Sequence, residues 1–375
     1  MKVPAGDYGG MAMKARAAVI YEKDAPFQIE EVELDGPRAH EVLVKMVSSG
    51  ICHTDAIAKA GEMPVSFPAV LGHEGAGIVK EVGSRVLTVR PGDHVVLTYS
   101  SCGDCENCLA GRPAYCTKFV SLNFIGEVSE ERSGIMKGSQ RVSKFFGQSS
   151  FATYAVVHER NVVKVAEDVE LTLLAPLGCG ILTGAGTVLS KLRPVAGDSI
   201  AVYGCGAVGL SAVMAAKLAG CFPIVAVDVI ESRLAAAKQL GATHVVNGRD
   251  NPVSSVVKEI TNGGSNFAVE TTGNSQVVLE AVRGLRTLGV AAIVGVSGDV
   301  TFNMTADIMT EGKSVIGVVE GDAPPQLLIP RLVEFFRSGR FPFDKLCQVY
   351  TLDRIDEAFN DAQTGSVIKP VIQIQ

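Results

Sequence analysis

The sequence predicts an α/β protein in which a mostly antiparallel β domain is joined to a doubly wound parallel sheet. Two observations predict this fold class. The chain has 375 residues, of which 47% are hydrophobic, and that length exceeds the size at which a single hydrophobic core usually keeps growing. The spacing of the apolar runs also changes after Pro194. We therefore expect two domains of different construction.

Short valine-rich runs characterise the first part of the chain, from about Ala15 to Val165. Glycine, proline and aspartate interrupt these runs, as is typical of antiparallel strands joined by tight turns. The expected strands include Val42–Val47, Gly77–Val82, His94–Thr98 and Phe151–Val157. We expect the polar stretch from Ser121 to Ser150 to form an exposed loop with no chemistry of its own, and residues 1–12 to form a terminal tail.

Strand-like and helix-like segments alternate after Pro194, which is typical of parallel strands joined by crossover helices. The expected strands are Ser199–Tyr203, Ile224–Val227, His244–Val246, Phe267–Glu270, Val290–Val294 and Ser314–Val319. The expected helices are Gly209–Ala219, Glu231–Leu240, Gln326–Ser338 and Arg354–Thr364, and a last strand is expected at Val367–Ile374. We assign residues 1–181 to the first domain, 182–318 to the second, and 319–375 to a return into the first.

Composition excludes several classes of partner. The formal net charge is -6 and basic clusters are absent, which argues against binding to nucleic acid or to anionic lipid. The sequence contains no apolar run of about eighteen residues and no signal-peptide pattern at its N-terminus. We therefore expect a cytoplasmic protein that acts on a small molecule and has neither a membrane nor a nucleic-acid partner.

A glycine-rich turn follows the first expected strand of the second part. The motif GCGAVG contains Gly204, Gly206, Val208 and Gly209. Glycines between a strand and a helix let backbone N–H groups approach a pyrophosphate at the helix N-terminus. Asp228 ends the next expected strand, where a carboxylate can bind the adenosine ribose and repel a 2′-phosphate. The pattern predicts a Rossmann domain that binds NAD rather than NADP, although Arg233 could serve a phosphate.

Four cysteines at short spacing indicate a closed metal site. They are Cys102, Cys105, Cys108 and Cys116. Four thiolates can complete a tetrahedral zinc site without outside ligands. An iron–sulfur cluster is the alternative, although bacterial ferredoxins close with a gap of three residues and a proline, and disulfides are disfavoured in the expected compartment. The lobe at 100–117 is thus predicted to hold structural zinc, and Cys205, Cys221 and Cys347 are expected to be small buried residues.

A second set of donors is open. Cys52, His73 and Cys179 offer two thiolates and an imidazole, which leaves one vacant position on a tetrahedral zinc ion, as in catalytic sites. Because Cys179 lies at the expected domain junction, we expect the metal in the cleft between the domains. Glu74 is either a supporting acid or an occasional ligand.

Zinc at such a site would act as a Lewis acid that lowers the pKa of a bound alcohol and stabilises the alkoxide, while NAD accepts the hydride. Thr54 is placed to take the alcohol proton, and Asp55 is a candidate partner for the second ring nitrogen of His73. His53 could face the cofactor pyrophosphate. The predicted chemistry is reversible oxidation of an alcohol to an aldehyde.

The motifs together resemble those of the zinc-dependent medium-chain alcohol dehydrogenases, from about Ala15 to the C-terminus. They are GHEGAG at Gly72–Gly77, the four-cysteine lobe, LGCG at Leu177–Gly180 with Thr183–Gly184, and GCGAVG. The resemblance within this family is to the benzyl (aryl) alcohol dehydrogenases. It rests on Ser149–Ala155, Asp228–Leu234, Val318–Gly321 and Phe341–Asp344.

The resemblance implies a GroES-like catalytic domain and two zinc ions per chain, one catalytic and one structural. It implies that Cys52, His73 and Cys179 bind the catalytic zinc and that Thr54 starts proton transfer. It also places His53 and Lys369 near the pyrophosphate, Thr183 against the nicotinamide, Tyr99 and Phe145 beside the substrate, and Asp55 and Glu74 in support of the metal. A homodimer or homotetramer is expected.

One departure from many members of the family is Ile57, which stands where they place a histidine that passes the proton to solvent. Benzyl-type enzymes share this departure. The sequence therefore predicts an NAD-dependent dehydrogenase for primary aromatic or allylic alcohols whose proton leaves by another route.

Two alternatives stay open. A glutathione-dependent formaldehyde dehydrogenase shares CHTDA and GHEGAG, but its substrate needs charged groups at the cleft, whereas Glu62–Val65 is largely apolar. A regulatory protein that binds zinc and NAD without turnover is the non-enzymatic alternative, since fold alone does not imply activity.

Overall fold

The computed structural model describes residues 13–126, 134–249 and 252–375 of the chain. These residues form two compact units. The first unit comprises the described residues up to Cys179 together with Pro324–Val333 and Leu346–Gln375, and the second comprises Gly180–Ala323 with Glu334–Lys345. Residues 1–12, which the sequence predicted to form a terminal tail, lie outside the residues that the structure describes.

The first unit is built from strands in two groups. A closed barrel contains β1 (Met13–Ile20), β2 (Gln28–Leu34), β7 (Ile135–Lys137), β8 (Gln140–Lys144) and β4 (Ala69–Val70). A seven-stranded sheet runs in the order β10 (Val162–Lys164), β6 (His94–Leu97), β5 (Glu74–Val82), β3 (Glu41–Gly50), β18 (Lys369–Gln373) and β17 (Cys347–Thr351), with β9 (Tyr154–His158) also paired to β3. Most pairs are antiparallel; β4–β8 and β17–β18 are parallel.

Valine supplies much of the core of this sheet. Val42, Val44 and Met46 on β3 pack with residues of β5, β6 and β9 in one buried cluster. β-branched side chains suit such a surface because they pack well between pleated strands. The short helices of this unit are α1 (His53–Lys59), α2 (Glu106–Leu109) and α3 (Leu171–Leu174).

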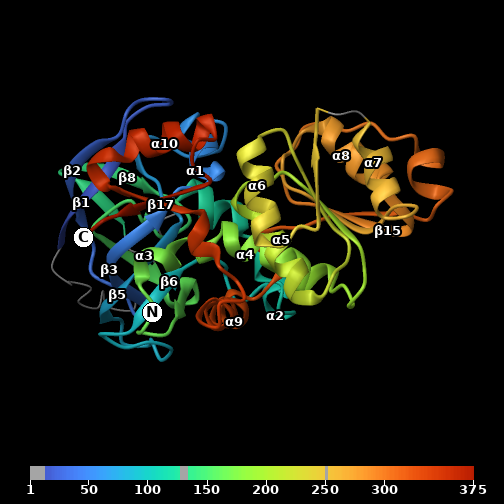
Figure 1. Cartoon of the computed structure of the whole chain (residues 1–375). Helices are drawn as coiled ribbons and strands as arrows, with labels where there is room; N and C mark the ends of the chain where they lie inside the picture. The colour runs from blue at the N-terminus through green and yellow to red at the C-terminus, as the bar shows by residue number, and fades with distance from the viewer. Residues whose placement is uncertain (1–12, 127–133, 250–251) are drawn as a thin grey trace. The chain divides into compact units, whose positions relative to one another are not determined.

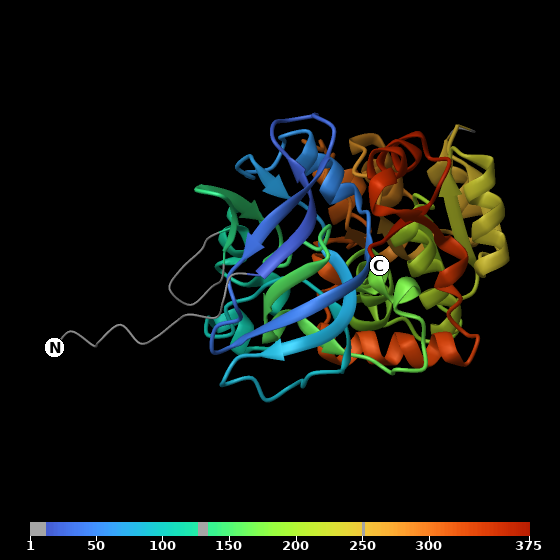
Figure 2. The same ribbon diagram turned by 90° about the vertical axis from the view of Figure 1, so that its left-hand side faces the viewer.

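Two C-terminal segments, Pro324–Val333 and Leu346–Gln375, belong to the first unit, whereas residues 319–323 and Glu334–Lys345 belong to the second, and the predicted domain boundaries stay a prediction. β18 pairs antiparallel with β3, with Val371 opposite Gly50, and the red β17–β18 pair can be followed beside the blue β3 in Figures 1 and 2. Helix α10 (Ile355–Thr364) precedes β18 and packs against it. Helix α9 (Pro325–Arg337) occupies the place of the helix expected at Gln326–Ser338.

The second unit is a parallel six-stranded sheet. Its order is β13 (His244–Asn247), β12 (Ile224–Asp228), β11 (Ile200–Tyr203), β14 (Ser265–Glu270), β15 (Leu285–Ile293) and β16 (Ser314–Gly317). Helices α5 (Ala207–Ala219) and α6 (Glu231–Leu240) lie on one side of this sheet, and α7 (Val253–Ile260) and α8 (Ser275–Arg283) lie on the other (Figure 1). Helix α4 (Gly180–Gly186) packs on α5. The predicted fold class is confirmed.

The prediction of an exposed loop from Ser121 to Ser150 is wrong for the residues that the structure describes. A π-helical turn spans Ser121–Ile125, β7 and β8 follow, and Phe145 and Gln148 are buried. The polar residues of this stretch alternate with apolar ones that close the barrel, so composition concealed two strands. Cys205 and Cys221 are buried as expected, whereas Cys347 is half-buried.

Among the described residues, no single helix has the length and apolar character needed to cross a bilayer. The bent pair Leu171–Gly178 and Gly180–Leu192 meets that test by length and composition alone.

Candidate functional site

The open donor set assembles inside the first unit. Cys52 directly precedes α1, and His73 directly precedes β5, whose first residue is Glu74. Cys179 is the last residue of the first segment of the unit. One possible ligand atom from each of these four residues lies within 4.8 Å of all the others. The side chains of His73 and Glu74 are fully buried. The structure thus brings together residues that are far apart in sequence, in a spacing that suits one metal ion.

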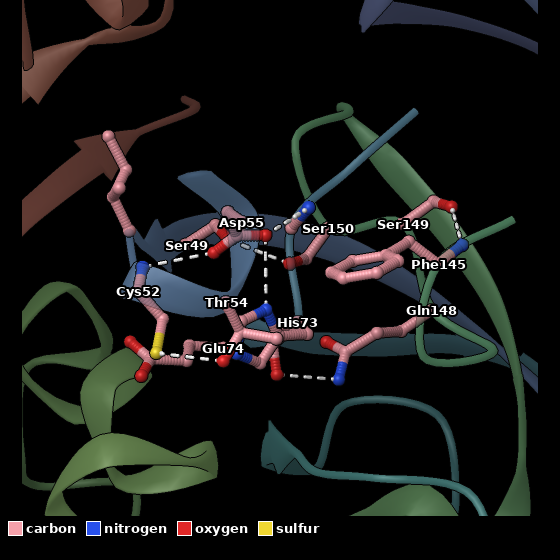
Figure 3. Close-up of polar contacts among 12 residues, drawn as sticks. Ser49, Cys52, Thr54, Asp55, His73, Glu74, Phe145, Gln148, Ser149 and Ser150 are labelled. Carbon is pink, nitrogen blue, oxygen red and sulfur yellow. Dashed lines mark hydrogen bonds and ion pairs between the residues drawn. The ribbon is translucent and has the colours of Figure 1, made fainter. Parts of the chain in front are cut away.

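Asp55 fixes the imidazole of His73 in this set (Figure 3). Its Oδ1 lies 3.0 Å from His73 Nδ1 and accepts the backbone N–H of Gly72 at 3.0 Å, while its Oδ2 accepts the N–H of Cys52 at 2.9 Å. One buried carboxylate therefore ties two donor-bearing segments together. The other ring nitrogen, Nε2, is buried and has no hydrogen-bond partner among the residues described, so it is free to bind a metal.

Two phenylalanines hold the same ring. Phe146 stacks on His73 with ring centroids 4.4 Å apart, and Phe145 meets it edge-on at 5.6 Å. These rings belong to an aromatic cluster that includes Phe119, Phe124 and Tyr99. The two predicted pocket residues, Tyr99 and Phe145, are thus buried in one cluster, and Phe145 contacts a member of the donor set.

Lys369 neutralises Glu74. Its ammonium lies 2.5 Å from Glu74 Oε2 and donates to the carbonyl of Ile51 at 2.9 Å, and both side chains are buried. Burial raises the pKa of Glu74, while the lysine opposes that effect. Burial alone would lower the pKa of Lys369, but Glu74 and the nearby thiols raise it. The predicted role of Lys369 near a pyrophosphate stays a prediction, and its observed partner is the acid of the donor set.

The electrostatics of the set favour a thiolate. The hydrogen bond from Cys179, helped by His73, lowers the pKa of Cys52 well below its usual value in spite of burial. Burial disfavours the imidazolium of His73, but the facing carboxylate of Asp55 and the Cys52 sulfur raise its pKa well above the usual value. The lowered pKa of Cys52 favours the thiolate, which is the form that binds a divalent cation, and such a cation would compete with the proton for His73 Nε2.

Thr54 and His53 flank this set on the first turn of α1. Thr54 Oγ1 lies 3.7 Å from Cys52 Sγ, close to the donors (Figure 3). His53 is exposed, and Ile57 on the same helix is half-buried. The position of Thr54 suits a proton acceptor beside a bound alcohol, whereas His53 contributes no donor to the set.

The four-cysteine lobe is local. One sulfur from each of Cys102, Cys105, Cys108 and Cys116 lies within 4.8 Å of the others. Cys105 N–H donates to Cys102 Sγ at 3.4 Å and Lys118 N–H donates to Cys116 Sγ at 3.4 Å. Backbone N–H groups of Thr117 and Cys108 lower the pKa of Cys105 to about 6, while burial raises that of Cys102 to about 12. The lobe fits a closed thiolate site for zinc.

The glycine turn belongs to the second unit. It connects β11 to the thirteen-residue helix α5, whose N-cap is Gly206. A Cβ at Gly209 would meet the carbonyl oxygen of Gly204 at 1.8 Å, so only glycine permits this close approach of helix to strand. The turn fits the pyrophosphate of a dinucleotide at a helix N-terminus.

The carboxylate of Asp228 stabilises the glycine turn through hydrogen bonds as well as lying next to it. Its carboxylate accepts the N–H of Cys205 at 2.6 Å, of Val229 at 2.7 Å and of Ile230 at 2.9 Å. Thr271 Oγ1 donates to the carbonyls of Tyr203 and Gly204 from the neighbouring strand end. The sequence identified Asp228 as a ribose acceptor, but its three backbone bonds make it part of the turn as well.

The remaining predicted cofactor residues lie near that turn. Arg233 Nε is buried without a partner in the part of the chain that the structure describes. Thr183 lies on α4, next to Gly184, whose Cβ would meet the carbonyl oxygen of Val208 at 2.0 Å. Gly184, next to Thr183, thus lies against Val208 at the start of α5, and the charge of Arg233 acts on the thiol of Cys205 in the glycine turn.

Comparison with known proteins decides the family. Residues 38–167 match the alcohol dehydrogenase GroES-like domain and residues 207–338 match the zinc-binding dehydrogenase family. A geraniol dehydrogenase of Castellaniella defragrans is 40% identical over 365 residues, which cover 96% of this chain and 98% of that protein. The chain belongs to the zinc-dependent medium-chain alcohol dehydrogenase family.

Solved structures of this family agree. The structure of an alcohol dehydrogenase zinc-binding domain protein from Burkholderia ambifaria is 44% identical, with a TM-score of 0.95 over 97% of this chain and 100% of that chain. The benzyl alcohol dehydrogenase of Acinetobacter calcoaceticus is 45% identical, with a TM-score of 0.93 over 97% of this chain and 100% of that chain. The predicted family is confirmed, and the chain is a zinc-dependent alcohol dehydrogenase.

Sequence reasoning missed several residues of this family member's site. Phe146, which stacks on His73, directly follows the predicted pocket residue Phe145. Two consecutive phenylalanines could have indicated that Phe146 belongs to the site as well. Gln148 lies in the supposed loop and carried no signal. The contact of Lys369 with Glu74 joins residues at opposite ends of the chain, and no local pattern indicates such a pair.

Proposed function

We propose that this dehydrogenase oxidises primary aromatic or allylic alcohols to aldehydes with NAD, reversibly. The observation that carries the proposal is the buried open set, in which His73 Nε2 is unpaired and the thiol of Cys52 has a lowered pKa. Cys52, His73 and Cys179 would hold zinc there, with Glu74 as an occasional ligand. Bound zinc supplies a Lewis acid that stabilises the alkoxide form of the alcohol.

The residues around the set have separate tasks in this proposal. Thr54 would accept a hydrogen bond from the alcohol hydroxyl on Oγ1 and relay the proton, giving up its own hydroxyl proton to water as the alcohol proton arrives. Asp55 keeps the His73 ring in one tautomer and orientation. Lys369 pairs with Glu74, which compensates the charge of that buried acid. The glycine turn and Asp228 would hold NAD, which would supply the hydride acceptor, and the carboxylate of Asp228 would select NAD over NADP.

The substrate class follows from the apolar, aromatic surroundings of His73. Phe145 and Tyr99 belong to this buried aromatic cluster, and the proposal takes them to line the pocket for an aromatic or allylic chain. The benzyl alcohol dehydrogenase and geraniol dehydrogenase among the relatives support the same class. These relatives do not separate a benzylic from a terpenoid alcohol, so the proposal covers both.

The test is NAD reduction with benzyl alcohol, geraniol, ethanol and S-hydroxymethylglutathione, on protein whose zinc content is measured. We expect two zinc ions per chain and the highest kcat/KM for benzyl alcohol or geraniol. Preference for the glutathione adduct would contradict the substrate class and favour a formaldehyde dehydrogenase. Absence of turnover with two zinc ions bound would favour the regulatory alternative.

We also propose that the enzyme is a cytoplasmic homodimer or homotetramer, as the family resemblance implies. Sedimentation of the zinc-loaded enzyme would give the subunit number. A monomeric mass would contradict the predicted assembly without affecting the chemistry.

A further inference from the structure

A turn with unusual backbone conformation lies behind the open donor set. It joins β8 to β9, and Phe146, Gly147 and Ser149 have φ values of 52°, 62° and 53°. Non-glycine residues adopt this conformation only where their surroundings hold them in it. Here Ser149 Oγ accepts the N–H of Phe145 at 2.9 Å and donates to the carbonyl of Val70 at 2.7 Å. The turn therefore presents Gln148 from a fixed backbone.

The amide of Gln148 spans the donor-bearing segment. Its Nε2 donates to the carbonyl of His73 at 2.8 Å, and its Oε1 accepts the N–H of Gly75 at 3.2 Å. The two bonds lie on either side of Glu74 in the sequence, so one buried side chain grips the backbone before and after that acid. Figure 3 shows the amide pointing at the backbone of His73 and away from the sulfur of Cys52.

The same amide reaches the segment that carries Cys179. Gln148 Nε2 also donates to the carbonyl of Thr98 at 3.2 Å, and Thr98 Oγ1 donates to the carbonyl of Gly178 at 2.8 Å. A Cβ at Gly178 would meet the carbonyl oxygen of Leu97 at 2.2 Å, so this segment lies directly on the end of β6. Four hydrogen bonds from two side chains thus connect the backbone of the segment His73–Gly75 with that of Gly178, the residue before Cys179.

We propose that Gln148 is a positioning residue that sets the spacing between the His73–Glu74 segment and Cys179, and thereby the affinity of the open set for zinc. It touches neither substrate nor cofactor and acts through the backbone of the ligands. The inference rests on the proposed function, because it takes this donor set to be a zinc site. Partners outside the ligand set typically change metal affinity by about 10–100-fold when they are removed.

Asn123 provides a matched control for Gln148. Both amides are buried, and each makes three hydrogen bonds to backbone. Asn123 accepts the N–H of Ser100 and donates to the carbonyls of Ser100 and Phe119. None of its bonds touches the segments of the open set. Gln148→Met and Asn123→Leu therefore remove equal numbers of buried bonds from two different places.

The experiment measures zinc release from the full-length protein to the chelator 4-(2-pyridylazo)resorcinol, with the zinc content and denaturant stability of each variant. Cys52→Ala identifies which kinetic phase belongs to the open set. We expect Gln148→Met to speed that phase by at least about tenfold. We expect Asn123→Leu to leave it at the wild-type rate, even though both variants lose stability. The cobalt-substituted protein gives a second readout, since the thiolate-to-cobalt and d–d absorption bands should shift in Gln148→Met alone.

Three results would overturn the inference. Wild-type release and an unchanged cobalt spectrum in Gln148→Met would show that the amide does not set the site, and the proposed function would stand. Equal acceleration in Asn123→Leu would show a general loss of packing. If wild-type protein and Cys52→Ala bind equal amounts of zinc, the open set is no zinc site, and the proposed function falls together with the inference.

Discussion

The two donor sets of the first unit are built in opposite ways. The closed lobe takes its four sulfurs from the single segment Cys102–Cys116, and backbone N–H groups of that segment donate to two of them. The open set takes its atoms from residues as far apart as Cys52 and Cys179, and it depends on Asp55, Lys369 and Gln148 to bring them together. A local site needs only its own loop, whereas the open one needs the whole fold of the unit.

Replacing Cys52 with alanine tests the open side of this comparison and has the largest expected effect. It removes one proposed zinc ligand, so we expect kcat/KM for benzyl alcohol to fall by at least about a thousandfold and zinc to fall from two ions per chain to one. Far-ultraviolet circular dichroism should stay unchanged. Cys221→Ala, which alters a buried cysteine outside both sets, is the control, and equal loss of activity there would contradict the assignment.

Replacing Cys105 with serine tests the closed side. A thiolate site contributes folding free energy directly, so we expect the free energy of unfolding to fall by several kcal/mol. The molecules that stay folded should keep most of their kcat, because the lobe supplies no group to the chemistry. Thermal unfolding with and without a chelator measures the first effect. Loss of kcat in fully folded protein would show that the two sites are coupled.

Replacing Asp228 with alanine moves the comparison to the second unit, where the cofactor turn is also locally built. We expect the ratio of kcat/KM for NAD over NADP to fall by about 10–100-fold, or about 1.4–2.8 kcal/mol. Both cofactors should also bind more weakly, because three backbone N–H groups lose their acceptor. Asp228→Asn separates the two effects, since it removes the charge and keeps an acceptor oxygen. An unchanged ratio would mean that another group, such as Arg233, selects the cofactor.

The smallest expected effect concerns an ion pair of the second unit that belongs to neither donor set. The hydrogen bond from Arg283 lowers the pKa of Asp307 from its usual 3.8. A lowered carboxyl pKa stabilises the fold above the unfolded-state value, and this stabilisation is lost as pH falls through the folded-state value. Asp307→Asn should therefore cost about 1 kcal/mol at neutral pH and progressively less below about pH 4.

Urea unfolding of both proteins between pH 7 and pH 3 gives this difference. The measurement gives a reference for the effect of acid on stability at an ion pair that binds no zinc. A difference that persists unchanged at pH 3 would show that the ion pair is not its cause.

Much of this architecture follows from the sequence, and the two sites show where such reasoning stops. Period and turn residues predicted helix Glu231–Leu240 to the residue, because its apolar spacing and the flanking glycine are local signals. The four-cysteine lobe was predicted equally well, because the short spacing of its cysteines indicated that their sulfurs meet, and they lie within 4.8 Å of one another. The prediction of a loop at 121–150 was wrong, because β7 and β8 belong to a barrel whose polar residues face outward. No local pattern in the sequence indicates that barrel.

The supports of the open set were the least predictable. The residue types of Cys52, His73 and Cys179 suggested a metal, and family resemblance named the ligands. The pairing of Lys369 with Glu74 and the grip of Gln148 on His73 depend on which strands become neighbours. Tertiary structure decides such contacts. A single sequence therefore predicts the donor residues but not the buried side chains that set the distances between them.

The order in which a ribosome makes these residues has a consequence for the nascent chain. Glu74 leaves the tunnel early, yet the ammonium that faces it in the finished enzyme is not made until residue 369. An unfinished chain that closed its β sheet would bury the carboxyl of Glu74 without its partner and would leave β3 without β18, so the first unit should mature only after translation has passed β18. Fusions or deletions at that late strand should therefore impair the metal centre more than equal changes in the cysteine lobe's outer turns.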